Sequence, residues 1–357
     1  MANKVLIKGN LAIAQAAIDA GLECYFAYPI TPQNEIGEFM SDKMPSLGKT
    51  YINAESELAA INMVIGACAT GTKAMTSSSS CAIALMQEAI SAMATAEIPG
   101  VIISVMRSGP GLGNITPSQG DYFQAVKGGG NGDYRTIVLA PSTIDEAVEY
   151  THRIFHLAWK YRNPAMLLAD GILGQMMEPV EFKHYDFEEI SSKDWELDGV
   201  GEKENKRPPR KLVSLHMGGD DLIVLNGKLQ KKYDEIEQNE VLYEEFMLDD
   251  AEIMITAFGT VARVAKSAIM TLREQGIKIG LFRPVTLWPF PKKQINKRAH
   301  QVKYILDVEM NEGQMAEDVL ASINCEVEFD KLTKLGGQFV KASDIVKKVT
   351  EKALCLN

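Results

Sequence analysis

Short apolar runs alternate with longer amphipathic stretches along the first half of the chain. The runs contain four or five residues each, and the stretches between them repeat apolar residues every three or four positions. These two patterns are typical of buried strands and of helices. The expected strands are 25–28, 73–76, 101–105, 136–139 and 165–169, and the expected helices are 11–20, 57–70, 81–94 and 143–161. The alternation predicts βαβ units around a parallel sheet.

One of these helices has a clear start signal. Ser142 or Thr143 follows Pro141, and Asp145 or Glu146 stands three residues after the capping candidate. A hydroxyl followed by a carboxylate at this spacing can satisfy the free N–H groups of a first helical turn. We therefore expect the helix to begin at about residue 143.

The pattern changes after residue 180. Residues 184–250 are strongly charged, with local helical character over 229–246, and predict a connector or surface excursion. A second αβ pattern then follows, with strands expected at 252–259, 278–284 and 304–309 and helices at 260–275 and 315–323. The predicted fold class is α/β, with two domains of largely parallel sheets flanked by helices. The expected division is 1–183, 184–250 and 251–357.

Composition excludes several functional classes. The 357 residues carry a net charge of −10, so a footprint for nucleic acid or an anionic membrane is not expected. No apolar run approaches the roughly 20 residues of a membrane span. The five cysteines are widely spaced without a C-x-x-C pair, which disfavours a disulfide framework, a zinc site and iron–sulfur ligands. With no signal-peptide pattern at Met1–Leu6 and no metal spacing among the histidines, we expect a reduced, cytoplasmic protein.

The loop after the strand expected at 25–28 is rigid and carries a hydroxyl. Tyr28-Pro29-Ile30-Thr31-Pro32 places Thr31 between two prolines, which fix the backbone on both sides. Ligands of open α/β sheets bind beyond the carboxyl ends of the strands, where Thr31 could meet an anion or a carbonyl. Thr31 could equally cap a helix that begins near Pro32.

Two carboxylates stand before the second expected helix. Glu55 and Glu57 are two positions apart and cannot share one helix face. Either of them would be stabilised by the positive end of the helix dipole. A functional alternative is a buried acid that exchanges one hydrogen bond with a cofactor.

An arginine ends the strand expected at 101–105, and a glycine-rich turn follows it. The planar guanidinium of Arg107 suits a carboxylate or a phosphate, and Gly109, Gly111 and Gly113 would permit a close approach of the backbone. Arg107 could instead pair with an acid from another domain. The turn lacks the spacing of a nucleotide fingerprint. The turn-rich segments 119–122 and 128–135 are weaker candidates for a site or an interface.

Taken together, these motifs resemble one family. The segments that carry the resemblance are Tyr28–Pro32, Glu55–Glu57, Met106–Gly111, Arg283–Pro291 and Gly313–Met315, in this order. They resemble the 2-oxoacid:ferredoxin oxidoreductases, specifically the alpha-type subunit that binds the pyrimidine end of thiamine diphosphate. The resemblance implies a pyrimidine-binding domain at 1–183 and a transketolase C-terminal-like domain at 251–357. Length and the Ser77–Cys81 run look most like the 2-oxoisovalerate type, with the 2-oxoglutarate type next.

The resemblance also implies roles for individual residues. Glu57 is similar to the family acid that hydrogen-bonds the pyrimidine ring, and Tyr28 and Pro29 belong to the same cofactor-binding region. Thr31 and Arg107 look like the residues that hold the carboxylate and the carbonyl of a 2-oxoacid. These three, Glu57, Arg107 and Thr31, are the expected catalytic residues. No metal ligand is expected in this chain.

The family's diphosphate and Mg²⁺ motif is not recognisable in the sequence. Gly218-Gly219-Asp220-Asp221 is a poor match to it. The resemblance therefore implies a shared thiamine diphosphate, a separate diphosphate-binding subunit with Mg²⁺, and gamma-type and ferredoxin-like subunits with iron–sulfur clusters. The implied reaction is oxidative decarboxylation of a branched-chain 2-oxoacid with coenzyme A, giving acyl-CoA, CO₂ and reduced ferredoxin. Alternatives are 2-oxoglutarate or pyruvate as substrate, a non-catalytic assembly subunit, and a complete thiamine enzyme related to transketolase.

Overall fold

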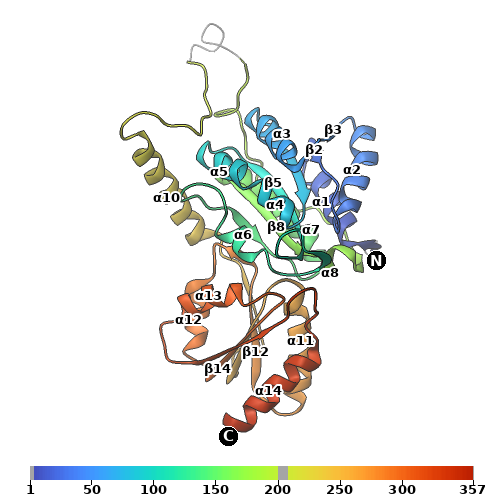
Figure 1. The fold of residues 1–357 in the computed structure, drawn as a ribbon, viewed down its shortest axis with the longest axis vertical. Coiled ribbons are helices and arrows are strands. Elements are labelled where there is room, and N and C mark those ends of the chain that lie inside the picture. The colour runs from blue at the N-terminus through green and yellow to red at the C-terminus, as the bar shows by residue number, and fades with distance from the viewer. Residues whose placement is uncertain (1–3, 200–207, 357) are drawn as a thin grey trace.

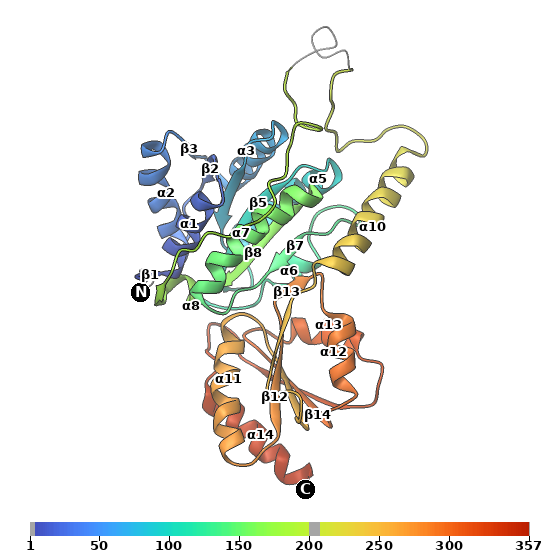
Figure 2. The same ribbon diagram turned by 180° about the vertical axis from the view of Figure 1, so that it is seen from behind.

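The computed structural model describes residues 4–199 and 208–356, and two β-sheets with flanking helices dominate it (Figures 1 and 2). The first sheet has the order β13-β7-β8-β5-β4-β2-β3, and β6 pairs with β5 beside this path. Its strands are β2 (Cys24–Ala27), β3 (Thr50–Asn53), β4 (Ala74–Ser78), β5 (Gly100–Ser108), β6 (Asn114–Pro117), β7 (Ile137–Leu139), β8 (Pro164–Asp170) and β13 (Thr286–Trp288). The strands from β7 to β3 run parallel to their neighbours. The predicted α/β class with largely parallel sheets is confirmed.

Helices connect these strands and cover both faces of the sheet. They are α1 (Gly9–Asp19), α2 (Asn34–Ser46), α3 (Glu57–Ala69), α4 (Cys81–Leu85), α5 (Gln87–Thr95), α6 (Tyr122–Val126), α7 (Ile144–Tyr161) and α8 (Gly171–Gln175). The expected capping at α7 is present: Thr143 Oγ1 accepts a hydrogen bond from the backbone N–H of Glu146 at 3.2 Å. The Glu146 carboxylate in turn accepts from the backbone N–H of Ser142 at 2.8 Å. Beside α1, β1 (Val5–Lys8) and β9 (Met177–Val180) form a small antiparallel ribbon.

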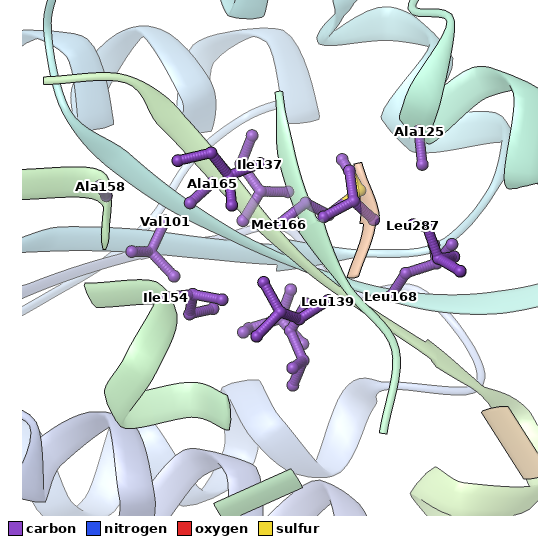
Figure 3. Packing of buried hydrophobic residues seen from close by; sticks show 14 of the residues in the cluster. Val101, Ala125, Ile137, Leu139, Ile154, Ala158, Ala165, Met166, Leu168 and Leu287 are labelled. Atoms are coloured by element: carbon purple, nitrogen blue, oxygen red, sulfur yellow. The ribbon is translucent and has the colours of Figure 1, made fainter. Parts of the chain in front are cut away.

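The core of the first half lies around the central strands. Every residue of β4 and β8 is buried, which explains why these strands appear as continuous apolar or small-residue runs rather than alternating patterns. Figure 3 shows Val101 of β5 and Ala165 and Met166 of β8 packed together near Ile154 and Ala158 of α7. This packing fixes the carboxyl ends of the strands, where the candidate site residues lie.

The second sheet has the order β10-β12-β11-β14-β15. Its strands are β10 (Tyr243–Phe246), β11 (Ile253–Thr256), β12 (Ile279–Pro284), β14 (Tyr304–Glu309) and β15 (Glu328–Thr333), and its helices are α11 (Gly259–Glu274), α12 (Lys292–Ala299), α13 (Gln314–Ser322) and α14 (Ala342–Leu356). Figure 1 shows α11 and α14 on one face of this sheet and α12 and α13 on the other. The second half therefore has three layers, with the sheet between two layers of helices, and contains its own core.

The charged segment 184–250 contains more structure than the sequence pattern indicates. Helix α10 (Asp221–Asn239) lies along the side of the first half, with Leu229, Tyr233 and Ile236 buried (Figure 2). The helical character expected over 229–246 ends at Asn239, and residues 243–246 form β10 instead. That prediction is wrong at its carboxyl end because β10 pairs antiparallel with β12, a partner almost forty residues away.

We call the αβ unit around the β13-β7-β8-β5-β4-β2-β3 sheet the first half, and the unit around the β10-β12-β11-β14-β15 sheet the second half. The two halves contact each other through side chains as well as being connected by the polypeptide backbone. Arg283, at the end of β12, is 1% exposed and donates two hydrogen bonds of 2.7 Å to the carboxylate of Glu146. Strand β13 lies antiparallel to β7 and thus belongs to the first sheet although it follows the second half's β12. Among the described residues, no helix is both long enough and apolar enough to cross a membrane.

Candidate active site

The site residues predicted from the sequence stand at the carboxyl ends of neighbouring strands. The Tyr28–Pro32 loop follows β2, and Arg107 is the penultimate residue of β5. Ser80, which was not predicted as a site residue, follows β4, the strand between β2 and β5 in the sheet. In a parallel sheet these ends share one edge, which is where open α/β folds bind ligands. The topology therefore gathers residues that are widely separated along the chain.

Thr31 and Arg107 are in direct contact. The Arg107 guanidinium donates from Nη1 to the carbonyl oxygen of Thr31 at 3.1 Å. Thr31 does not cap α2, because that helix begins at Asn34 after Gln33 and has no side-chain cap. The hydroxyl of this exposed threonine is thus not used for helix capping, and the Thr31 backbone is bound by a guanidinium, the group that best binds a carboxylate.

The glycine-rich turn after β5 is held against Arg107. Arg107 Nη2 donates to the carbonyl of Leu112 at 2.8 Å. Gly113 has φ +59°, and a Cβ there would lie 1.7 Å from the carbonyl oxygen of Ser108. Only glycine fits this turn, so the sequence places glycine where the loop must fold back on the arginine.

The structure separates the two candidate carboxylates. Glu57 opens α3 and is 8% exposed, whereas Glu55 is exposed. Ser56 caps the helix by accepting a hydrogen bond from the N–H of Ala59 at 3.2 Å. Within the part of the chain that the structure describes, the Glu57 carboxyl makes no hydrogen bond or ion pair. The carboxyl of a mostly buried residue that has no protein partner is available to a ligand that supplies one, such as a ring nitrogen.

The Glu57 segment lies next to the Tyr28–Pro32 loop. Strands β2 and β3 pair in parallel, and the N–H of Ala54 donates to the carbonyl of Ala27 at 2.8 Å. Tyr28 and Pro29 line a pocket of about 310 Å³ together with Asn53 from β3. Glu57 is not among the residues that line this pocket, so the structure brings the segments together without placing Glu57 in it.

A larger cleft of about 660 Å³ lies between the two halves. On one side it is lined by Ser80, Cys81 and the 109–111 turn, and on the other by residues 310–312 and 335–336. Cys81 Sγ is 3.1 Å from Arg107 Nη2, which connects the cleft to the Thr31–Arg107 pair. The cleft therefore opens directly beside the residues predicted to bind substrate.

The cleft also contains a residue pair that sequence reasoning did not identify. Ser80 Oγ is 2.5 Å from the Asp121 carboxylate and accepts a hydrogen bond from the backbone N–H of Arg107 at 2.9 Å. Burial raises the pKa of Asp121 to about 6, although the Ser80 hydroxyl and the nearby Arg107 charge act in the opposite direction. The only sequence signal was the Gln119–Tyr122 segment, noted as turn-rich.

That segment also forms the contact between the halves. The Gln119 side chain is completely buried, donates to the carbonyl of Phe258 at 2.9 Å and accepts from the N–H of Met310 at 3.1 Å. Gln314, from the Gly313–Met315 motif, donates to the carbonyl of Gly120 at 2.8 Å. The segment 119–122 thus lines both a site and an interface.

The other weak candidates are structural. The 128–135 loop packs on α5, where the N–H of Gly129 donates to Gln87 Oε1 at 2.9 Å. Over residues 4–199 and 208–356 no cluster of His, Cys, Asp and Glu is suited to hold a metal ion. The described cysteines Cys24, Cys68, Cys81 and Cys325 are all free.

Comparisons with known proteins show the family to which the chain belongs. Residues 15–245 match the thiamine diphosphate-binding family model of pyruvate flavodoxin/ferredoxin oxidoreductases, and residues 251–345 match core domain II of pyruvate:ferredoxin oxidoreductase. Ketoisovalerate oxidoreductase subunit VorB of Methanothermobacter thermautotrophicus is 46% identical, over 98% of this chain and 97% of the relative. 2-Oxoglutarate synthase subunit KorA of Methanocaldococcus jannaschii is 35% identical, over 96% of this chain and 98% of the relative.

Solved structures extend the comparison. The 2-oxoglutarate:ferredoxin oxidoreductase of Magnetococcus marinus superposes with a TM-score of 0.86 at 25% identity, over 98% of this chain. This chain spans 65% of that longer chain. A split-gene transketolase, at 11% identity and a TM-score of 0.57, shares the fold. The chain therefore belongs to the 2-oxoacid:ferredoxin oxidoreductases, as an alpha-type subunit.

Proposed function

We propose that this subunit supplies the pyrimidine-binding and substrate-binding half of a coenzyme A-acylating oxidoreductase for branched-chain 2-oxoacids. The preferred substrate is 3-methyl-2-oxobutanoate, and the products are acyl-CoA, CO₂ and reduced ferredoxin. The hydrogen bond from the Arg107 guanidinium to the backbone carbonyl of Thr31, beside an interdomain cleft, carries the proposal, since it brings the arginine and the threonine residue together at one edge of the sheet. The 46% identity to a ketoisovalerate oxidoreductase subunit supports the branched-chain choice.

Individual residues take distinct roles in this proposal. Glu57 holds the pyrimidine ring of thiamine diphosphate through its buried carboxyl, and Tyr28 and Pro29 shape the adjoining pocket. When bound, thiamine diphosphate supplies the electron sink for decarboxylation. Arg107 binds the carboxylate of the 2-oxoacid in a planar fork, and the Thr31 hydroxyl donates to its carbonyl oxygen. The division into 1–183, 184–250 and 251–357 is part of the same proposal.

The remaining chemistry is assigned to partner subunits. One partner binds the diphosphate with Mg²⁺, and gamma-type and ferredoxin-like partners contain iron–sulfur clusters that pass electrons to ferredoxin in the cytoplasm. Exposed apolar side chains on the segments that carry the site support a partner surface there. They are Leu58 (45% exposed), Leu85 (57%), Leu112 (79%) and Ile115 (59%). Burial of such a patch on association is favourable.

The reconstituted complex tests the activity and the substrate together. The chain is co-expressed with its neighbouring subunits, and decarboxylation rates are measured with 3-methyl-2-oxobutanoate, 2-oxoglutarate and pyruvate. The highest kcat/KM is expected for the branched-chain acid. A preference for 2-oxoglutarate would place the chain with its KorA relatives instead, and full activity of the isolated chain would overturn the shared-site proposal.

Glu57→Gln tests the catalytic role of this subunit. The amide cannot exchange a proton with the cofactor as the Glu57 carboxyl does, so kcat of the assembled complex should fall by at least about 100-fold. Glu55→Gln is the matched control, because this carboxylate is exposed two residues away, and it should retain near-normal activity. If the complex with Glu57→Gln is as active as the wild type, the subunit has an assembly role and the catalytic assignment is wrong.

A further inference from the structure

Ser80 has an unusual backbone conformation at the edge of the cleft. It has φ +34° and ψ −94°, a positive-φ conformation outside the three main allowed regions, which residues with a side chain seldom adopt. Such strain costs free energy and persists where the surrounding structure requires it, often at functional sites. Here the strained residue places one hydroxyl between the backbone of Arg107 and the carboxylate of Asp121.

The single hydroxyl of Ser80 has two possible acceptors. It lies 2.5 Å from Asp121 Oδ2 and 3.1 Å from the carbonyl oxygen of Arg107, and it accepts from the N–H of Arg107 at 2.9 Å. When Asp121 is ionised, its carboxylate accepts a hydrogen bond from the Ser80 hydroxyl. A protonated Asp121 can instead donate a hydrogen bond to Ser80 Oγ, and the Ser80 hydroxyl is then free to donate its own hydrogen bond to the Arg107 carbonyl. The protonation of Asp121 is therefore transmitted to the strand end that carries Arg107.

Other charged groups near Asp121 define its electrostatic surroundings. Arg107 from β5 is the principal cation, Cys81 from α4 lines the same cleft, and Glu312 faces it from the second half. The neighbouring Tyr122 hydroxyl is engaged elsewhere, because it donates to Asp318 at 2.7 Å. Arg107 is thus the charge through which Asp121 can influence an anionic ligand.

We propose that Asp121 is a positioning residue that acts through Ser80 on Arg107 and couples binding of the 2-oxoacid carboxylate to uptake of a proton. The inference rests on the proposed function, since it assigns the carboxylate to Arg107. Ionised Asp121 acts through space on the Arg107 charge, and its negative charge weakens the attraction of the guanidinium for a substrate carboxylate, while Ser80 links Asp121 to the Arg107 backbone. Substrate binding therefore favours protonated Asp121, and substrate affinity falls as the pH rises and Asp121 ionises.

The test is the pH dependence of KM in the reconstituted complex, measured from pH 5.5 to 8 with saturating coenzyme A and an artificial electron acceptor. In the wild type, the KM for the 2-oxoacid should rise by about 3- to 10-fold through pH 6 to 7. Asp121→Asn should abolish this rise and give a lower KM at pH 7.5. A change in kcat alone would contradict the proposal.

Ser80→Gly separates the hydroxyl from the backbone strain. Glycine adopts positive φ more readily than serine does, so the variant should relieve the backbone strain while it removes the hydrogen bond to Asp121. Loss of that bond raises the pKa of Asp121 further, and the rise in KM should move to higher pH. An unchanged midpoint would show that Ser80 does not connect Asp121 to the binding site.

Asp133→Asn provides the control, because Asp133 is an exposed carboxylate twelve residues after Asp121 and outside the cleft. It should keep the wild-type KM profile, and a flattened profile would assign the effect to general surface charge. If the wild-type complex oxidises no 2-oxoacid, the proposed function fails. If it is active and Asp121→Asn keeps the wild-type profile, the inference alone fails.

Discussion

Single side chains at the site differ in how far the sequence could predict them. Thr31 and Arg107 stand at strand ends in motifs with restricted backbones, so their chemistry and location follow from local pattern. Glu57 could not be told from Glu55 by dipole arguments, and burial in the structure separates them. Asp121 could not be assigned, because its hydrogen bond to Ser80 joins residues 41 positions apart.

Arg107→Lys tests the planar fork at the residue scale. The guanidinium donates to two separate carbonyls, those of Thr31 and Leu112, and a lysine provides a single point charge. The KM for the 2-oxoacid should rise by about 10- to 100-fold, with a smaller change in kcat. Steady-state kinetics of the assembled complex measure both constants, and an unchanged KM would remove Arg107 from the substrate site.

Asp121→Asn should also change thermal stability in a pH-dependent way. Burial raises the folded-state pKa of Asp121 from 3.8 to about 6, so the folded chain binds this proton more tightly than the unfolded chain does. The contribution of protonated Asp121 to the stability of the folded state is fully present below about pH 4, and it is lost as the pH rises through 6. The variant should therefore be more stable than the wild type at pH 7.5, by on the order of 3 kcal/mol.

Melting curves at pH 4 and pH 7.5 check this expectation. The difference in Tm between variant and wild type should be small at the acid end and should favour the variant at neutral pH. A difference that is the same at both values would show that the substitution acts through packing rather than through the charge of Asp121.

Secondary structure elements follow the local pattern where their partners are local. Helices α3 and α7 begin within one residue of their expected starts, because capping groups and apolar periodicity coincide there. The stretch 229–246 does not follow this rule. Its last four residues alternate exposed and half-buried positions as β10, and the edge of β12 determines that conformation.

Thr143→Ala tests the cap of α7. It removes the oxygen that accepts the N–H of Glu146, and loss of such a cap costs about 1 kcal/mol. Urea unfolding should show a lower midpoint with an unchanged slope. Thr143→Ser keeps the accepting oxygen and should retain most of the wild-type midpoint; equal losses in the two variants would mean that the methyl group, not the cap, is responsible.

The arrangement of the whole molecule depends on polar groups buried between the halves. Gln119 and Arg283 are each at most 1% exposed and make their hydrogen bonds to residues more than 130 positions away. Nothing in the periodicity of the chain indicates such partners, so the sequence predicts two αβ units but not the cleft between them. The candidate site depends on this junction, because the cleft is lined from both halves.

Arg283→Met tests the junction. Removal of the buried guanidinium takes the charge partner from the partly buried Glu146 carboxylate, which keeps only its hydrogen bonds from Ser142, and the loss costs about 3 kcal/mol, the lower end for a buried pair. The unfolding free energy in urea should fall by that amount. Arg263→Met is the control, since its pair with Glu178 is half-exposed and worth less than about 1 kcal/mol. Similar losses of unfolding free energy in both variants would show that the buried ion pair contributes no more to stability than the half-exposed one.

Strand β13 has a consequence for how the protein is made. The first sheet receives this edge strand from residues 286–288, long after the ribosome has completed β7. During synthesis the nascent first half therefore carries an open β7 edge with unpaired backbone groups, which is a template for association with other chains. Vectorial synthesis leaves this sheet unfinished until four-fifths of the polypeptide has been translated, so the nascent chain has to be protected from aggregation over that interval.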